Sequence, residues 1–327
     1  MTGRSKNLLT LFRYFQKMHL PISYIKHDEI DFKKWDSAIS AAANSRVYAV
    51  SAFLNNMCEG NWDALISGDY EYLMPLPFRK KFGINYIYVP AFIQQLGIFS
   101  SNYIDEKVVS AFLQVIPKKF RYCNIVLNSN NCSVDLPAVL KKNYLLPLHD
   151  SYNILQKKYS RSAKRNIKKA IQEGVSIEER ISPEITIQLH QQRFKNNIGA
   201  SDNDYRKLTQ LLLLLTEEEK CISVAAKKNN TIIATSTYII YKDRLIFLLN
   251  GNSEKSLKTG ATHLLKDYVI NKFSDSAFTL DFEGSDFPSF ARFYEQFGAK
   301  QIELYPHLII NRLPLPYKWL KRSTVSL

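Results

Sequence analysis

The sequence predicts an α/β protein with mixed sheets, divided into two similar units at residues 1–155 and 156–327. The chain has 327 residues, of which 46% are hydrophobic, and this length exceeds the usual size of one domain. Strand-like and helix-like segments alternate along the first half, and a second such alternation begins near residue 160. Each unit is therefore expected to form a twisted mixed sheet flanked by helices.

The elements of the first unit follow from short patterns. Residues 4–23 carry apolar and basic side chains and predict a short amphipathic helix, which either packs on its own domain or touches a membrane surface. YEYLMPLPFRKKFGINYIYVP, at 70–90, predicts two strands around Gly83. YIDEKVVSAFLQVIP predicts a helix, and YCNIVLN predicts a strand. No run approaches the ~18 apolar residues of a membrane-spanning helix.

The second unit contains three strand-like runs in CISVAAKKNNTIIATSTYIIYKDRLIFLLNGN, at 221–252. The short polar segments KKNN and YKD separate them, so the three runs are expected to be adjacent antiparallel strands. The segment GNSEKSLKTG, at 251–260, predicts a loop that leads into a helix beginning near Ala261.

This loop is a candidate anion site, because a helix N-terminus offers free N–H groups and the positive end of the helix dipole. The alternative is a plain turn that contains a glycine. The residues concerned are Lys258, Thr259, Gly260, Ala261 and Thr262.

The segment LDFEGSDFPSFARFYEQFGAK, at 280–300, places two acids where a strand is predicted to end. Strand alternation would turn Asp281 and Glu283 to one face, and Pro288 would begin a helix that carries Tyr294. The two carboxylates are candidates for a general base or for recognition of an ammonium group. Alternatively, one caps the next helix and the other pairs with a lysine.

The charge balance constrains the partners. Lys and Arg outnumber Asp and Glu by 44 to 30, and a formal net charge of +14 favours phosphate, nucleic acid or an anionic membrane surface. In the basic run at 157–169, Arg161, Arg165 and Lys168 are candidates for a substrate phosphate, or they form a solvated helix face.

The cysteine and histidine patterns exclude several functions. Four cysteines form no CxxC pair and no metal-ligand spacing with the six histidines, so no metal site and no disulfide framework are expected. This cysteine usage is consistent with a reducing cytoplasm. The histidines show no Ser-His-Asp or Cys-His arrangement, which predicts chemistry without a covalent nucleophile.

Two passages resemble a known family. YSRSAKRNIKKAIQEGVSI, at 159–177, and LDFEGSDFPSFARFYEQFGAK resemble the tandem-GNAT branch of the GNAT superfamily, typified by the FemAB and FemX peptidoglycan aminoacyltransferases. The resemblance implies two GNAT units and acyl transfer to an amine. The donor would be acyl-CoA or aminoacyl-tRNA. Acyl-CoA would then be a substrate, and the protein would hold no tightly bound cofactor. The acceptor would be a cell-envelope precursor or a small molecule.

The resemblance also implies roles for particular residues. The pantetheine arm of a donor would lie beside Leu248, Leu249 and Asn250, its pyrophosphate would lie at 258–262, and Tyr294 would be the general acid. Leu257 and Thr262 depart from the family's coenzyme-binding pattern. The leading prediction is an acyltransferase in the cytoplasm, with peripheral contact at the inner membrane face as an option. The alternative is a catalytically degenerate binding or scaffold protein with a basic surface for phosphate or nucleic acid.

Overall fold

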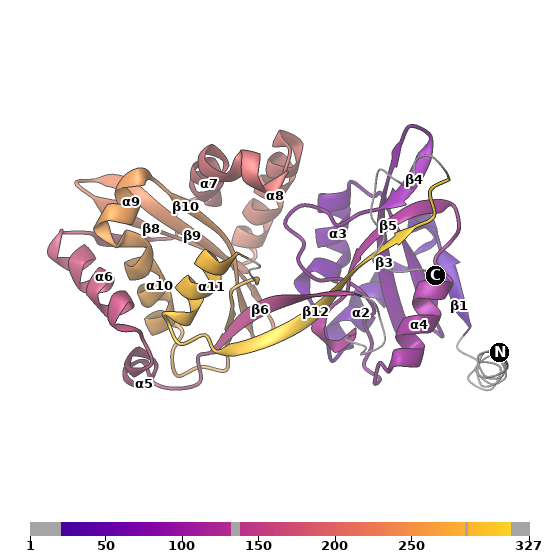
Figure 1. Ribbon diagram of the computed structural model, residues 1–327, viewed down its shortest axis with the longest axis horizontal. Helices are drawn as coiled ribbons and strands as arrows, with labels where there is room; N and C mark the ends of the chain where they lie inside the picture. The colour runs from indigo at the N-terminus through magenta and orange to yellow at the C-terminus, as the bar shows by residue number, and fades with distance from the viewer. Residues whose placement is uncertain (1–20, 132–137, 285–286, 315–327) are drawn as a thin grey trace, which may run out of the picture.

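The computed structural model describes residues 21–131, 138–284 and 287–314, so the helix predicted within residues 4–23 lies almost wholly outside the described residues. Twelve strands form one mixed sheet in the order β1-β2-β3-β4-β5-β12-β6-β11-β10-β9-β8-β7. Helices cover the sheet on both sides, and the molecule is elongated along the strand order (Figure 1). The predicted mixed α/β fold is confirmed.

The first half of the chain supplies the strands of one end of the sheet. Helices α2 and α3 precede the β2–β3–β4 meander, and α4 connects β4 to β5. The bounds are β1 Ile22–Ile25, α2 Phe32–Ala41, α3 Ser51–Cys58, β2 Trp62–Ser67, β3 Tyr72–Lys81, β4 Ile84–Ile87, α4 Glu106–Gln114, β5 Phe120–Val126 and β6 Val139–Pro147. The two strands predicted around Gly83, the helix and the following strand are all confirmed.

The second half has a similar order of strands and more helices. The bounds are α5 Tyr152–Lys157, α6 Arg161–Gln172, β7 Ser176–Glu179, α7 Pro183–Ile198, α8 Asp202–Glu217, β8 Cys221–Lys228, β9 Thr231–Tyr241, β10 Arg244–Asn252, α9 Glu254–Thr259, α10 Ala261–Lys272, β11 Thr279–Asp281, α11 Pro288–Glu295 and β12 Gln301–Asn311. Strands β8, β9 and β10 are antiparallel neighbours, as predicted. Their turns use Asn229, Asn230 and Lys242 at positive φ, which matches the polar turn sequences.

Two local predictions are wrong. The segment expected to be a loop at 251–260 contains the one-and-a-half-turn helix α9, and only Gly260 separates it from α10. Strand β11 ends at Asp281, and Glu283 follows it at a φ of 58°. Because a left-handed residue breaks strand alternation, Asp281 and Glu283 do not share one face of a strand.

The two halves exchange strands. β6, from the first half, pairs with β11, and Leu280 stands opposite Leu146. β12, the last strand, pairs with β6 through Gln301–His307 and with β5 through His307–Asn311. Figure 1 shows β6 and β12 running together across the middle of the molecule. The sheet is therefore continuous, because each half supplies a strand that the other half pairs with. The boundary between residues 155 and 156 stays a prediction.

The hydrophobic cores follow the same exchange. One core combines α2, α3 and β2 of the first half with α7, α8 and β10 of the second. A second core lies between the sheet and the helices α5, α6, α10 and α11. A third core packs α4 against β3 and β5, and β12 adds Leu308 and Ile310 to it. Along β10, Leu245 and Phe247 enter the second core while Ile246 and Leu248 enter the shared one, as strand alternation requires.

Candidate active site

A cavity of about 780 Å³ opens where two parallel strands part. β10 and β11 are paired from Arg244–Thr279 to Ile246–Asp281, and beyond this point they diverge. The cavity lies in the gap, between α7 on one side and α9, α10 and α11 on the other, and Ala91 and Phe92 of the first half close one wall. Its size and its concentration of aromatic side chains are typical of a ligand site.

The β10 wall contains a β-bulge. The register with β9 shifts between Phe247–Tyr238 and Leu249–Thr237, so Leu248 is the extra residue. Because a bulge residue is left out of the ladder, its backbone N–H can serve a ligand. Leu248, Leu249 and Asn250 all line the cavity, which is where the resemblance places a donor arm.

Glu283 lines the cavity just after β11. Its backbone N–H donates to Asp281 Oδ1 at 2.9 Å, which holds the turn. The Oε1 atom of Glu283 is buried and has no hydrogen-bond partner within the described parts of the chain. Burial raises the pKa of this carboxyl well above its usual value. Burial therefore favours the protonated form of the Glu283 carboxyl, and this group can exchange a proton with a ligand in the cavity.

Tyr294 reaches the same cavity from α11. Its ring is stacked on Phe282, with 4.5 Å between the ring centroids, and the residue is only 7% exposed. Burial, reinforced by the nearby carboxylates of Glu283 and Asp281, raises the pKa of the phenol. The hydroxyl group therefore keeps its proton at neutral pH and can donate it.

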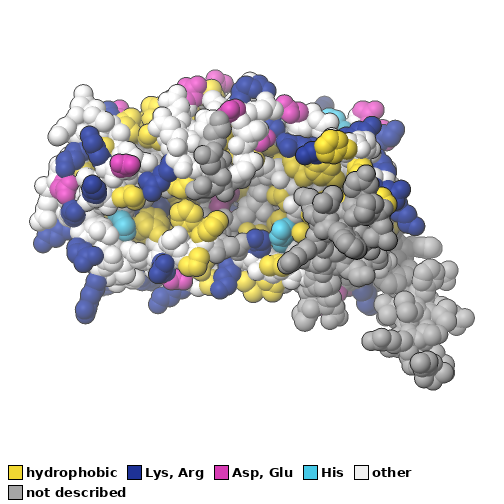
Figure 2. Space-filling view, turned by 45° about the horizontal axis from the view of Figure 1, so that its top comes forward, with side chains coloured by type: hydrophobic (Ala, Val, Ile, Leu, Met, Phe, Trp, Pro, Cys, Tyr) yellow, Lys and Arg dark blue, Asp and Glu magenta, His cyan; other side chains and the backbone are white. Residues whose placement is uncertain are grey.

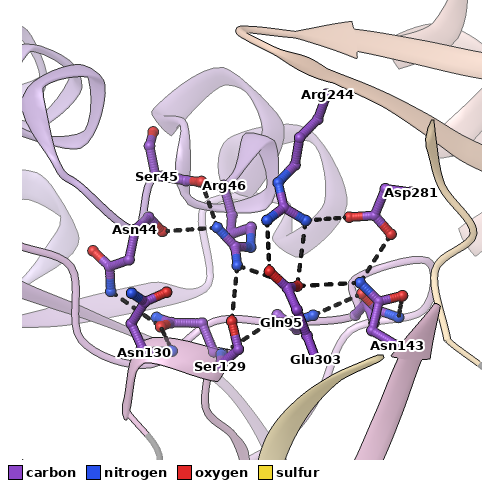
Figure 3. A network of polar contacts seen from close by, with 12 residues as sticks. Asn44, Ser45, Arg46, Gln95, Ser129, Asn130, Asn143, Arg244, Asp281 and Glu303 are labelled. Carbon is purple, nitrogen blue, oxygen red and sulfur yellow. Dashed lines mark hydrogen bonds and ion pairs between the residues drawn. The ribbon is translucent and has the colours of Figure 1, made fainter. Parts of the chain in front are cut away.

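Asp281 lies behind the cavity and does not line it. Its Oδ2 atom accepts from Arg244 Nη1 at 2.6 Å, and its Oδ1 atom accepts from Asn143 Nδ2 at 2.9 Å. Figure 3 shows Asp281 pointing toward Arg244 and Asn143. The structure therefore brings Glu283 and Tyr294 together and gives Asp281 structural contacts.

The network around Asp281 connects the two halves of the chain (Figure 3). Arg244 also donates to Glu303 Oε1 on β12 at 2.8 Å, and Arg46 of the first half lies 3.6 Å from Glu303 Oε2. Burial would raise the pKa of Glu303, but the hydrogen bond and charge of Arg244 hold it below its usual value. Two arginines and two carboxylates balance in charge, so removing any one of them would leave a buried charge uncompensated at the junction.

The predicted anion site at 258–262 is only partly at the cavity. Gly260 and Thr262 line it, whereas Lys258 is exposed and does not line it, and Thr259 and Ala261 are buried. Gly260 has a φ of 78°, and a Cβ atom there would lie 2.3 Å from the Asn166 carbonyl oxygen of α6. The glycine is therefore required by the close approach of α6, whatever else it does.

The basic side chains of α6 stand on its solvent face. Arg161, Arg165 and Lys168 are exposed, while Ala163 and Ile167 are buried against the second core. None of the three basic residues lines the cavity. They form a charged surface beside it, because α6 packs against α9 and α10.

Two cavity histidines were not predicted. His190 on α7 is almost buried, its Nδ1 atom lies 3.2 Å from the Tyr205 hydroxyl, and burial lowers its pKa to about 4. His263 on α10 lies 3.1 Å from Gln296 Oε1, and burial lowers its pKa as well. Both are neutral at pH 7. His190, Arg193 and Phe194 are spaced to share one helix face, and all three line the cavity. This spacing was the sequence signal that could have identified His190 as a cavity residue.

Lys266 lies beneath the cavity floor and is 1% exposed. Its Nζ atom donates to the Tyr238 hydroxyl at 2.8 Å and lies 3.1 Å from the centroid of the Phe247 ring. Burial lowers the pKa of this amine well below its usual value. The amine is therefore enclosed by the rings of Tyr238, Phe247 and Phe282 on the protein side of the cavity wall.

Within the described residues, no helix is both long and apolar enough to cross a membrane, and no cluster of three His, Cys, Asp or Glu side chains could hold a metal ion.

Comparison with known proteins identifies the fold. No protein-family model and no curated protein sequence matches the chain. Among solved structures, FemX is 11% identical with a TM-score of 0.58, over 89% of this chain and 98% of that chain. The C-terminal domain of a proposed lysylphosphatidylglycerol synthetase from Agrobacterium fabrum is 11% identical with a TM-score of 0.51, over 90% and 95%. A conserved protein of unknown function from Bacteroides thetaiotaomicron is 10% identical with a TM-score of 0.51, over 88% and 99%. The chain has a FemX-like tandem GNAT-type fold.

Proposed function

We propose that this chain is an N-acyltransferase, which moves an acyl or aminoacyl group from an activated donor to an amine in the cavity beside β10. One observation carries the proposal. Glu283, with a buried and unpartnered carboxylate oxygen, and Tyr294, with a protonated phenol, both face the cavity that opens between β10 and β11. A proton acceptor and a proton donor in one apolar site are what acyl transfer to an amine requires.

The reaction divides between these groups. Glu283 takes a proton from the acceptor ammonium, and the free amine attacks the donor carbonyl carbon. The Leu248 N–H, left out of the strand ladder, donates to the carbonyl oxygen as negative charge builds there. A C–N bond forms, the C–S bond of a thioester or the C–O bond of a tRNA ester breaks, and Tyr294 protonates the leaving group. The second proton of the attacking nitrogen passes to the Tyr294 phenolate, and Glu283 releases its proton to water, so both residues return to their starting forms.

The donor and the acceptor are proposed from the fold and from the cavity. Acyl-CoA or aminoacyl-tRNA is the donor, and a cell-envelope precursor is the acceptor. The cavity position beside Leu248–Asn250 supports the donor arm there. A cytoplasmic location is supported by three cysteines that are free and buried, Cys58, Cys123 and Cys221, since a reducing compartment keeps thiols in this form.

A second function is favoured by one observation. Most of the predicted anion site is used for packing: the turn between α9 and α10 packs on α6 through Thr259, Gly260 and Ala261. The exposed Lys258 does not line the cavity. A degenerate binding protein would keep the cavity and hold an apolar ligand there without transferring it.

Thermal unfolding of the full chain with acetyl-CoA, a long-chain acyl-CoA, CoA and aminoacyl-tRNA separates the two functions. A donor present at ~100 times its Kd stabilises the folded state by ~2.7 kcal/mol. We expect one donor class to stabilise the chain and to transfer its acyl group to a primary amine, followed by mass spectrometry. Stabilisation by a ligand that is never transferred would favour the binding protein.

A further inference from the structure

Three large apolar side chains are exposed around the mouth of the cavity. Leu257 on α9 is 62% exposed, and Phe287 and Phe290, at the start of α11, are 65% and 38% exposed. All three line the cavity, so their exposed parts form its rim. We refer to these three residues as the mouth patch. Neighbouring exposed apolar side chains on a soluble surface mark a site of interaction.

Exposed basic residues border the mouth patch. Lys255 and Lys258 share α9 with Leu257, Arg292 shares α11 with Phe290, and Arg193 stands on α7 across the cavity. Helix α6, which packs against α9 and α10, adds a further basic face. Over α9 and α11 the described exposed residues are three cations, Lys255, Lys258 and Arg292, and two acids, Glu254 and Glu295, and Arg193 across the cavity adds a further cation. In Figure 2, hydrophobic side chains gather over the second half of the chain and Lys and Arg side chains stand around them.

An anionic lipid bilayer complements both features at once. Its headgroups attract the basic border, and its interface takes up the apolar side chains. A nucleic acid would satisfy the basic border and could stack on Phe287, but it offers no apolar phase to Leu257. The cavity behind the patch is also walled mainly by aromatic and aliphatic side chains, so the apolar surface continues inward from the rim.

We propose that the mouth patch docks on an anionic lipid bilayer, with Lys255, Lys258 and Arg292 toward the headgroups and the cavity opening toward the lipid. The site described above would then meet its substrate at the membrane surface. The inference extends the proposed function to a partner, but vesicle binding is measured without turnover. An inactive chain that binds vesicles would therefore overturn the proposed function alone.

The test is sedimentation of the full chain with vesicles. We expect binding to phosphatidylcholine vesicles that contain about one third phosphatidylglycerol, little binding to pure phosphatidylcholine, and weaker binding as salt rises. The double variant Leu257→Ser with Phe287→Ser should bind about tenfold more weakly. Lys255→Gln with Lys258→Gln should also lose about tenfold, and its binding should depend less steeply on salt than that of the wild type, because Arg292 and the basic face of α6 remain. These positions are exposed, so thermal unfolding should match the wild type.

Phe82→Ser is the matched control, because Phe82 is 92% exposed beside Lys81 on the β3–β4 turn, far along the sheet from the cavity. It should bind vesicles as the wild type does. Residues 1–20 are present in every variant, so any binding that they provide would persist in the double serine variant. Undiminished binding in that variant, an equal loss in Phe82→Ser, or binding to tRNA but not to anionic vesicles would overturn the proposal.

Discussion

Each half of the sheet contains a pair of parallel strands that part, and the two openings are used differently. In the second half, β10 and β11 diverge after Ile246 and Asp281 and leave a cavity of about 780 Å³. In the first half, β4 and β5 are paired only from Asn85 to Ile87, and the hollow that remains beyond them is about 20 Å³.

The chain that follows the first strand of each pair makes the difference. After β10 it forms α9, whose Leu257 stays at the cavity rim. After β4, residues 91–99 turn back into the opening, where Leu96 pairs with Leu127 and Phe99 with Leu73. Gly97 has a φ of 91° in this segment, and a Cβ atom there would lie 2.3 Å from Asn131 Oδ1. The same architecture thus gives a packed core in one half and an open cavity in the other.

The filled opening also serves the open one. Ala91 and Phe92 begin the segment that turns back into the first opening, and they line the cavity of the second. Phe92 packs on Tyr205 and His190 with ring centroids 5.2 and 6.5 Å apart. Among the described residues, the first half therefore contributes two apolar side chains to the wall of the cavity. The following predictions test this division.

The largest effect is expected at Glu283, which is the proposed base and lines the open cavity. The described residues that line the first opening include no carboxylate that could replace it. Glu283→Gln should lower the rate of transfer by ~10²–10⁴-fold. Burial raises the pKa of Glu283, and a base must be deprotonated, so the wild-type rate should rise with pH through that raised pKa. The variant should lack this rise in single-turnover rates. A wild-type rate and pH profile in the variant would place the base elsewhere.

Asp281→Asn should act on stability. The change leaves Arg244 without the carboxylate that it contacts at 2.6 Å, and removing one partner of a buried ion pair costs ~3–5 kcal/mol of the free energy of unfolding. Chemical denaturation measures this loss. Asp150→Asn, which breaks the exposed pair with Lys158, is the control and should cost at most ~1 kcal/mol. If Asp281→Asn kept wild-type stability but transferred the acyl group as slowly as Glu283→Gln, Asp281 would be a catalytic residue.

Leu96→Ala tests the filled opening. Leu96 is 7% exposed and belongs to the shared core, so its truncation should cost ~2–5 kcal/mol of the free energy of unfolding. At temperatures where the variant stays folded, the transfer rate should stay close to that of the wild type. A large fall in rate with little loss of stability would show that the first opening takes part in the reaction.

His190 should make stability depend on pH. Burial lowers its pKa from 6.5 to about 4, so as pH falls the unfolded chain binds a proton before the folded chain does. This histidine should therefore cost ~3 kcal/mol of stability between pH 6.5 and about 4. His190→Gln should flatten the fall, as measured by denaturation across this range. His149→Gln, at an exposed histidine, should keep the wild-type slope, and equal slopes in all three proteins would refute the effect.

Local sequence signals predicted most of the second half. The turn residues Asn229, Asn230 and Lys242 defined the β8–β10 meander, and Pro288 marked the start of α11. The exchange of β6 and β12 could not be predicted in this way, because alternation identifies a strand but not a partner more than 150 residues away.

The site was predicted in part. Tyr294 and Glu283 were identified from one short segment, and the structure places both at the cavity. Glu283 was expected on a strand face, because a positive φ at a glutamate cannot be seen in a side-chain pattern. His190 was not identified, since its role as a cavity wall depends on α7 crossing β10, a tertiary contact. The partner of Asp281, Arg244, lies 37 residues away on another strand.

Tyr294→Phe is the sharpest test of acyl transfer in the cavity between β10 and β11. The change removes one hydroxyl from the cavity and leaves the ring stacked on Phe282. We expect the single-turnover transfer rate of the variant to be at least ~10-fold lower than that of the wild type. Donor affinity should be nearly unchanged, because proton donation to the leaving group acts in the transition state. Tyr144→Phe makes the same change in a buried ring 6.0 Å away that does not line the cavity, and it should keep the wild-type rate. If Tyr294→Phe kept full activity with a donor and acceptor that the wild type uses, Tyr294 would not be the group that protonates the leaving group.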